Sequence, residues 1–144
     1  MPRRPLSDLV KDQDPVLVSP DTSVREAAFL MRERQVGSVL VMEGVTLAGI
    51  FTERDALTRV LAEGLDAEKT AIKEVMTVHP LTLTPEHLFI DALRVMQENG
   101  FRHLPVAEHG RPLGIISIRD ALGREIGSLQ EEAETKEALS EILG

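Results

Sequence analysis

Apolar residues recur with a helical period at two places along the chain. They occupy Val24, Ala27, Ala28 and Met31 in the first place, and Phe89, Ala92, Leu93 and Met96 in the second. Both sets follow the spacing i, i+3, i+4, i+7, which lies on one face of an α-helix. The pattern predicts two amphipathic helices, each buried along one face, and Ser23 followed by Glu26 is typical of a capped start for the first.

Strands are predicted around both helices, in the same order each time. Each half of the chain has the pattern of a strand, the amphipathic helix, a hairpin of two strands and a second helix. These elements are predicted to begin at Val16, Val24, Ser38, Leu47 and Thr52 in the first half, and at Leu81, Phe89, His103, Leu113 and Ser117 in the second. The predicted order is therefore β-α-β-β-α, twice.

The two halves are copies of one another. Pro20 matches Pro85 and Gly49 matches Gly114 at one constant offset of 65 residues, without insertion or deletion. A copy of about 55 residues is a marginal domain on its own, because it buries only about 60% of its unfolded surface. We therefore expect an α/β (α+β) fold in which the two repeats pack around a pseudo-twofold axis. Clefts between such repeats are preferred places for small molecules.

The offset also divides the chain into parts. We expect a first domain at 6–64, a linker at 65–70, a second domain at 71–127 and a C-terminal helical tail at 128–144. Apolar residues of the tail are scattered among glutamates, and a short helix of this kind is marginal alone. It can cap its own module or dock on a second subunit or an effector, and both interpretations stay open.

Composition excludes several classes of function. Hydrophobic residues make up 42% of the chain and there is no cysteine, so disulfides and thiolate chemistry are excluded. No signal peptide or membrane-spanning run is recognisable, so a soluble, cytoplasmic protein without a membrane partner is expected. The net charge of −8 disfavours nucleic acid as the main partner. Because no nucleophile elbow, Walker loop or dinucleotide fingerprint occurs, we expect no catalytic residues and no enzyme.

The starts of the two second helices carry the candidate chemistry. Thr52-x-x-Asp55 and Ser117-x-x-Asp120 both fit a capping box, so one interpretation is that they only satisfy backbone N–H groups. The other interpretation is nucleotide binding. A helix start attracts phosphate, and a carboxylate can accept hydrogen bonds from the diol of a ribose.

Basic side chains near these positions can also bind phosphate. Arg54 and Arg119 directly precede the two aspartates and are either solvated or phosphate ligands. Arg102 and His103 begin the second middle strand, where a partly exposed structural histidine is the alternative. All four histidines lie in the second copy, but their spacing matches no compact zinc pattern, so no metal site is expected.

Four motifs together resemble the CBS (cystathionine-β-synthase) domain family. Gly49 to Asp55 and Gly114 to Asp120 resemble its G-h-h-[ST]-x-x-D signature, Ile72 to Thr77 with Pro80 resembles its opening, and His103 to Val106 resembles its middle strand. The resemblance implies a stand-alone tandem pair, called a Bateman module. Such a module binds AMP, ADP, ATP or S-adenosylmethionine between its repeats and regulates an attached or partner protein.

The resemblance also implies roles for individual residues. The signature aspartates, Asp55 and Asp120, would take the ribose hydroxyls, and the signature Thr52 and Ser117 would support ribose or phosphate. The opening segment and the middle strand would frame the base. The expected nucleotide-binding residues of the opening segment are Thr77, His79 and Pro80, with His79 near His103.

The two copies differ where the ligand is expected. The first copy has Asp12 and Asp14 where the second has Thr77 and His79. Because carboxylates oppose an anionic phosphate, the cleft of the second copy is expected to bind more tightly. No cofactor is expected beyond this ligand, with Mg²⁺ only if it enters with the nucleotide. A homodimer and an effector protein are the expected partners. The alternatives are a structural or dimerisation module without ligand and, against the charge, a nucleic-acid-binding regulator.

Overall fold

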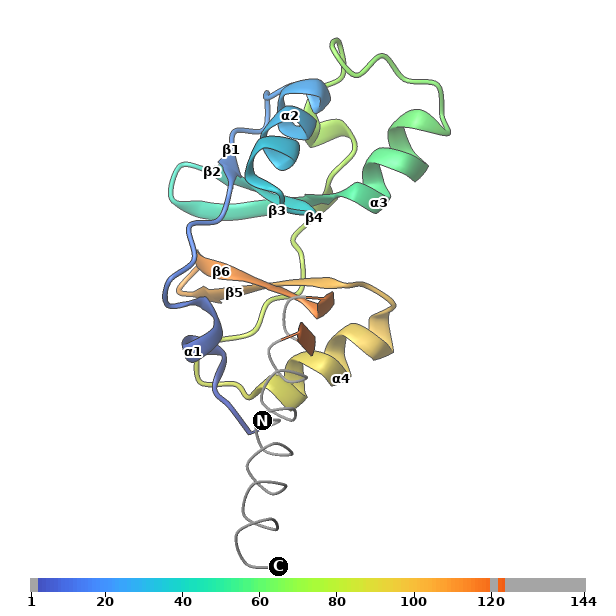
Figure 1. Ribbon diagram of the computed structural model, residues 1–144. Helices are drawn as coiled ribbons and strands as arrows, with labels where there is room; N and C mark the ends of the chain where they lie inside the picture. The colour runs from blue at the N-terminus through green and yellow to red at the C-terminus, as the bar shows by residue number, and fades with distance from the viewer. Residues whose placement is uncertain (1–2, 120–121, 124–144) are drawn as a thin grey trace, which may run out of the picture.

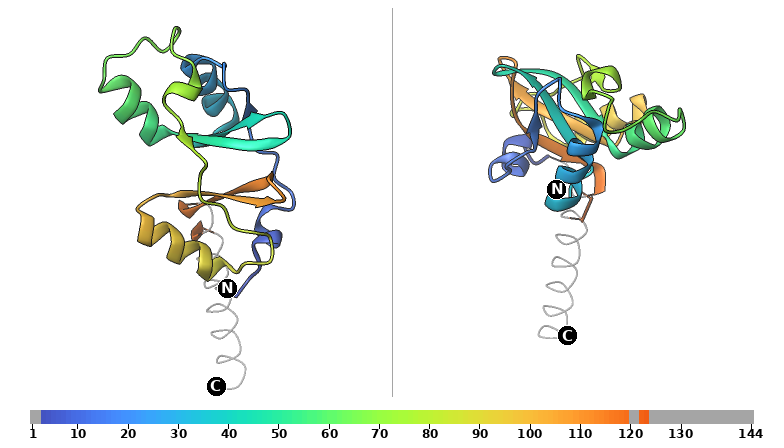
Figure 2. Two further views of the ribbon diagram at one scale, coloured as in Figure 1. Left: turned by 180° about the vertical axis from the view of Figure 1, so that it is seen from behind. Right: turned by 90° about the horizontal axis from the view of Figure 1, so that it is seen from above.

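Two repeats of helices and strands are stacked in the computed structural model, which describes residues 3–119 and 122–123 (Figure 1). The two hairpins face each other at the centre, and the longer helices lie on their outer sides, as the view from behind also shows (Figure 2). The predicted mixed class with two repeats is confirmed. The predicted helical tail at 128–144 lies outside the described residues.

The first repeat follows the predicted order of elements. It consists of β1 (Leu17–Val18), α2 (Val24–Arg34), β2 (Ser38–Glu43), β3 (Thr46–Thr52) and α3 (Glu53–Asp55), which continues as the π-helical segment η1 (Ala56–Leu61). β1 runs parallel to β2, and β2 is antiparallel to β3 with an irregularity between Val41 and Met42. The hairpin therefore begins and ends within one residue of the predicted positions.

The second repeat has the same hairpin and the same amphipathic helix. Its elements are η2 (Ile72–Glu74), β4 (Thr77–Val78), α4 (Phe89–Asn99), β5 (His103–Glu108) and β6 (Arg111–Ser117), and α1 (Leu6–Val10) precedes both repeats. The pairing of β5 with β6 copies that of β2 with β3, including an irregularity between Val106 and Ala107. Residues 118–119 and 122–123 are helical, as predicted after Ser117.

One predicted strand, at 81–83, is wrong, because only Leu83 bridges to Val106 of β5. In the first repeat the N–H of Leu40 donates to the carbonyl of Val16 at 2.9 Å. The offset of 65 residues puts Pro105 at the position of Leu40. Proline has no N–H to donate, so the matching bond to Leu81 cannot form and the strand shortens to one bridge.

Both amphipathic helices bury the predicted face, with one exception. α2 buries Val24, Ala27 and Met31, and Ser23 caps it by accepting the N–H of Glu26 at 3.1 Å. Ala28 was predicted on the same face but is exposed. α2 packs on the sheet through these three buried residues, which share one core cluster with Val39 and Val41 of β2.

The segments that open the two repeats are exchanged between them. α1, which precedes the first repeat, buries its apolar residues beside Phe89 and Met96 in the core of the second repeat. β4, which belongs to the opening of the second repeat, pairs with β3 of the first, where Val78 lies opposite Gly49 and Thr77 opposite Ile50. Each half of the molecule is therefore completed by a segment from the sequence of the other.

Direct hydrogen bonds also join the repeats at the hairpin turns and between η2 and the loop before α2. The N–H of Leu47 donates to the carbonyl of Gly110 at 2.9 Å. Lys73 donates to Asp21 at 2.9 Å, and this bond raises the pKa of Lys73 above its usual 10.5.

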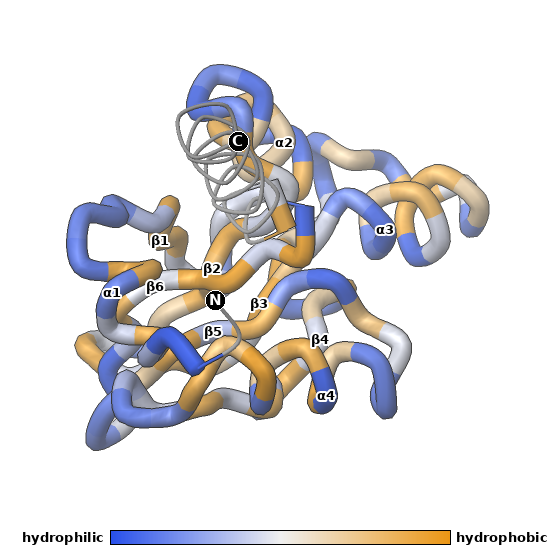
Figure 3. Tube along the Cα trace, turned by 60° about the horizontal axis from the view of Figure 1, so that its bottom comes forward, coloured by the Kyte–Doolittle hydropathy of each residue, from blue (hydrophilic) through white to orange (hydrophobic). Residues whose placement is uncertain are grey.

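Much of the hydrophobic sequence lies along the strands of the two hairpins, whereas the peripheral loops are mostly hydrophilic (Figure 3).

Candidate functional site

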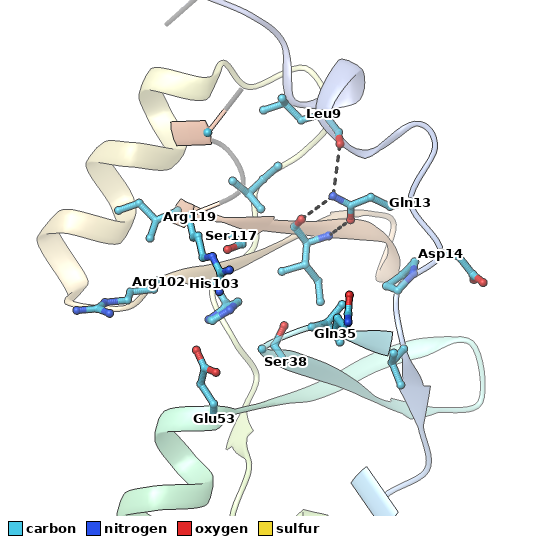
Figure 4. A pocket seen from close by; sticks show the side chains of 18 residues that line it. Leu9, Gln13, Asp14, Gln35, Ser38, Glu53, Arg102, His103, Ser117 and Arg119 are labelled. Carbon is cyan, nitrogen blue, oxygen red and sulfur yellow. Dashed lines mark hydrogen bonds between the residues drawn. The ribbon is translucent and has the colours of Figure 1, made fainter. Parts of the chain in front are cut away.

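A cavity of about 1290 Å³ lies between the two repeats. Its walls come from the end of α1 and the segment that follows it, from the start of β2, and from β5 and β6 (Figure 4). Both repeats therefore contribute to it, as expected for a cleft beside the pseudo-twofold axis. The volume is sufficient for a ligand of nucleotide size, since small-molecule sites commonly have volumes of about 300–1,000 Å³.

One end of the cavity is basic. Arg102, His103 and Arg119 line it together with Ser117, so four of the predicted site residues are brought together. In Figure 4 Arg119 and His103 lie close together at this end, Glu53 reaches toward them from the first repeat, and the side chain of Arg102 extends to the outside. Guanidinium groups suit phosphate because they can donate two parallel hydrogen bonds.

Glu53 and His103 face each other across the join between the repeats. A Cβ atom on Gly37 would lie 2.9 Å from Nε2 of His103 and 3.2 Å from Oε1 of Glu53. Glycine at this position therefore leaves the room in which the two side chains approach. Glu53 was not predicted as a site residue, because the Ile at the matching position of the second copy gave no sign of a functional carboxylate.

The other end of the cavity is apolar and amide-lined. The apolar residues Leu9, Val16 and Ile115 line it together with Gln13. Asp14 also lines the cavity, but in Figure 4 its carboxylate points away from the basic end. It lies 3.5 Å from the guanidinium of Arg34. Asp14, one of the two carboxylates that were expected to oppose phosphate in the first copy, is thus exposed and paired with Arg34.

Gln13 binds the edge of β6 with its side chain. Its Oε1 accepts the N–H of Ile115 at 2.8 Å, and its Nε2 donates to the carbonyl of Ile115 at 2.9 Å. A longer bond of 3.4 Å reaches the carbonyl of Leu9. Gln13 was not predicted as a site residue, because no local pattern indicates that a glutamine side chain will pair with a strand 102 residues away.

Thr52 and Asp55 lie at the start of α3 and form the predicted capping box. The N–H of Thr52 donates to Oδ2 of Asp55 at 2.9 Å, and the N–H of Asp55 donates to Oγ1 of Thr52 at 3.3 Å. Asp55 is only 8% exposed, with Arg59 3.6 Å from its carboxylate. Neither Thr52 nor Asp55 is among the residues that line the cavity.

Arg54 is held against the opposite repeat. Its Nη1 donates to the carbonyl of Gly100 at 3.0 Å, at the left-handed C-cap of α4. The matching residue of the second copy, Arg119, instead lines the cavity. The two arginines, which are equivalent in the sequence, therefore have different surroundings.

Thr77, His79 and Pro80 lie outside the lining of the cavity, beside the first repeat. Thr77 belongs to β4, and the N–H of His79 donates to the carbonyl of Ala48 at 3.1 Å, with His79 at a φ of 47°. This differs from the expected grouping with Ser117. Because the opening segments are exchanged, the segment that shares the cavity with Ser117 is 13–16. Asp120 lies outside the described residues.

Within residues 3–119 and 122–123, no three His, Asp or Glu side chains are grouped so that they could hold a metal ion. Across the same residues, no helix is both long and apolar enough to cross a membrane.

Comparison with known proteins identifies the family. The model of the CBS domain matches residues 6–62 and again residues 72–127. CBS domain-containing protein YhcV of Bacillus subtilis is 34% identical over 103 residues, which are 72% of this chain and 73% of YhcV. CBS domain-containing protein CBSCBSPB2 of Arabidopsis thaliana is 38% identical over 124 residues, but the match spans only 23% of that longer protein.

Solved structures agree with this assignment. A putative signal-transduction protein with CBS domains from Burkholderia ambifaria superposes with a TM-score of 0.79 at 30% identity, over 85% of this chain and 94% of the other. CBS domain protein PAE2072 from Pyrobaculum aerophilum, solved in complex with AMP, superposes with a TM-score of 0.73 at 23% identity, over 81% and 88%. With its repeated signature, its exchanged opening segments and two matches to the family model, this chain belongs to the CBS domain family and carries two CBS domains in tandem.

Proposed function

We propose that this chain is a non-catalytic regulatory module that binds one adenosine-containing nucleotide in the cavity between its repeats. AMP, ADP, ATP and S-adenosylmethionine are the candidate ligands. The observation that carries the proposal is the cavity itself, which combines a basic end at Arg102, His103 and Arg119 with an apolar end at Leu9, Val16 and Ile115. A nucleotide has the same division into a charged end and a planar, less polar base.

The polarity of the cavity favours one orientation of the ligand. Phosphate would bind at the guanidinium groups of Arg102 and Arg119, where it replaces water in charge-assisted hydrogen bonds. The ribose would lie along β6 near Ser117, whose side chain can donate and accept. The base would then reach the apolar end. Glu53 disfavours additional negative charge beside His103, so a monophosphate fits the charge of this end better than a triphosphate does.

The engagement of Arg54 supports a single site. At the start of α3 in the first repeat, Arg54 donates to the carbonyl of Gly100, and Asp55 is paired with Thr52 and with Arg59. A ligand at this helix start would have to break these bonds. The structure of PAE2072 in complex with AMP supports the choice of ligand class, because that protein has the same fold.

We further infer that the bound state is communicated to a partner protein and that two copies associate. The mechanism is linkage: a ligand shifts the packing of the two halves only as far as its affinities for the alternative packings differ. The absence of cysteine is in keeping with a cytoplasmic setting.

Thermal unfolding with each candidate ligand tests the proposal. A ligand at 100 times its dissociation constant stabilises the folded state by about 2.7 kcal/mol, so the unfolding temperature should rise by several degrees. Isothermal titration calorimetry should give one site per chain. Arg119→Ala should weaken binding at least tenfold. Arg94→Ala, which removes an exposed arginine on α4 outside the cavity, should not.

Two results would contradict the proposal. If none of the four ligands shifts the transition, the chain is a structural module and the cavity has another purpose. If binding occurs but Arg119→Ala and Arg94→Ala behave alike, the nucleotide lies elsewhere on the molecule.

A further inference from the structure

The wall of the cavity at its apolar end is attached differently from its counterpart in the first repeat. On the first repeat, Ile50 of β3 is covered by backbone pairing with Thr77 of β4. The offset of 65 residues makes Ile115 the counterpart of Ile50. Ile115 is covered by the carboxamide of Gln13, which accepts its N–H at 2.8 Å and donates to its carbonyl at 2.9 Å. One side chain thus replaces a short strand.

The backbone around Gln13 has few other anchors. Its own N–H donates to the carbonyl of Val10 at 3.0 Å, which ties it back to α1. The next bond to a strand is made by the carbonyl of Val16, which accepts the N–H of Leu40. Between these two points the chain passes Asp14 and Pro15, both of which line the cavity. Arg34 of the first repeat also donates to the carbonyl of Asp14, so what the two bonds between Gln13 and Ile115 supply is the attachment of this wall to β6.

The space for the carboxamide is provided by the signature glycine of β6. A Cβ atom on Gly114 would lie 2.6 Å from Oε1 of Gln13. That is closer than unbonded carbon and oxygen atoms tolerate, so the amide can lie on the strand only because position 114 has no side chain.

We propose that Gln13 is a positioning residue that ties the opening segment of the first repeat to β6 and so fixes one wall of the nucleotide cavity. The role in binding rests on the proposed function, whereas the tie itself does not. Without the carboxamide, the segment from Asp12 to Pro15 would gain conformational freedom, and a ligand would have to order it again. The anchoring of α1 through Leu6 and Leu9 in the core should keep the rest of the fold intact.

Hydrogen exchange followed by NMR tests the tie without any ligand. In Gln13→Ala the amide of Ile115 should exchange at least tenfold faster than in the wild type, while the amide of Ile50 should be unchanged because backbone pairing covers it. Gln13→Glu should restore part of the protection, since its carboxylate can still accept the N–H of Ile115 but cannot donate to the carbonyl.

Titration with AMP tests the consequence for the cavity. Gln13→Ala should weaken binding about tenfold, Gln13→Glu should fall between it and the wild type, and Lys11→Ala, an exposed neighbour outside the cavity, should match the wild type. Unchanged exchange at Ile115 in Gln13→Ala overturns the tie, and unchanged AMP affinity despite faster exchange overturns the positioning role. A wild-type chain that binds no nucleotide overturns the proposed function instead, and exchange at Ile115 alone then decides whether the tie exists.

Discussion

The glycine that begins each CBS signature is required because the opening segment of the other repeat packs directly against it. A Cβ atom on Gly49 would lie 2.9 Å from the carbonyl oxygen of Thr77 and 2.5 Å from Sδ of Met76. On Gly114 it would lie 2.7 Å from Cβ of Val10. Both glycines therefore allow close approach of an opening segment, which is a matter of space.

At this scale we predict that Gly49→Ala lowers the free energy of unfolding by about 1–3 kcal/mol, as for other overpacked sites. The carbonyl of Thr77 is backbone and cannot turn aside. Urea denaturation measures the loss, and Val45→Ala, at a side chain that is 61% exposed on the same hairpin, should stay within about 0.5 kcal/mol of the wild type.

Adding Met76→Ala to Gly49→Ala separates the two contacts. The Met76→Ala change removes the flexible sulfur but leaves the carbonyl of Thr77. The double variant should therefore keep the part of the loss of unfolding free energy that the clash with this carbonyl causes. Wild-type stability in Gly49→Ala alone would show that β4 does not lie this close to β3.

At the scale of single elements, the two helices that follow the hairpins begin alike in sequence but differ in setting. α3 begins with a closed capping box between Thr52 and Asp55, away from the cavity. Its counterpart begins after Ser117, which lines the cavity. The hydroxyl residue therefore caps a helix in the first repeat, whereas in the second repeat Ser117 lines the cavity.

Substitution of the two hydroxyl residues tests this division. Thr52→Ala should lower the free energy of unfolding by about 1 kcal/mol, the usual cost of losing an N-cap, and should leave nucleotide affinity unchanged. Ser117→Ala should weaken nucleotide binding measurably in calorimetry. Ser23→Ala, which removes the cap of α2, controls for loss of stability alone. Weaker binding in Thr52→Ala than in Ser117→Ala would place the ligand at the first repeat.

Local patterns predicted most of these elements because local interactions decide them. The period of apolar residues placed α2 and α4, and the matching turns placed both hairpins within a residue or two. The strand predicted at 81–83 failed for a non-local reason, since the residue that removes its hydrogen bond is Pro105 on β5. The predicted burial of Ala28 was wrong because it depends on how much of the surface of α2 packs against the sheet.

For the molecule as a whole, the sequence predicted two repeats with a cleft between them but not which segments meet there. The basic group of Arg102, His103 and Arg119 was predicted and is brought together with Ser117. The exchange of opening segments was not, because no pattern within 71–80 distinguishes pairing with β3 from pairing with β6. For the same reason Gln13 and Glu53 were missed, while Thr77, His79 and Pro80 were assigned to the wrong neighbours.

The exposed surface supports the proposed association of two copies. Leu57, Leu61 and Leu65 follow one another at intervals of four residues and are 59%, 72% and 43% exposed. Leu57 and Leu61 belong to the π-helical segment η1, Leu65 follows shortly after its end, and Leu122, the counterpart of Leu57, is 41% exposed as well. A twofold dimer can use such a surface on both copies.

Light scattering coupled to size-exclusion chromatography measures the association. The wild type should have twice the mass of the chain, and the double variant Leu57→Ser with Leu61→Ser should elute as a monomer with unchanged unfolding free energy. Val45→Ser changes an equally exposed apolar residue away from this helix and should remain dimeric. A monomeric wild type, or a dimer that survives the double variant, would rule out this face.

The crossing of the two opening segments has a consequence for each half taken separately. A polypeptide with only one repeat would carry an opening segment that packs on a second copy, and its own repeat would lack the opening segment that completes it. Two such polypeptides could complete each other by exchanging their opening segments. A single-repeat ancestor would therefore have had to form dimers. Duplication within one chain would then have joined two partners that already depended on each other.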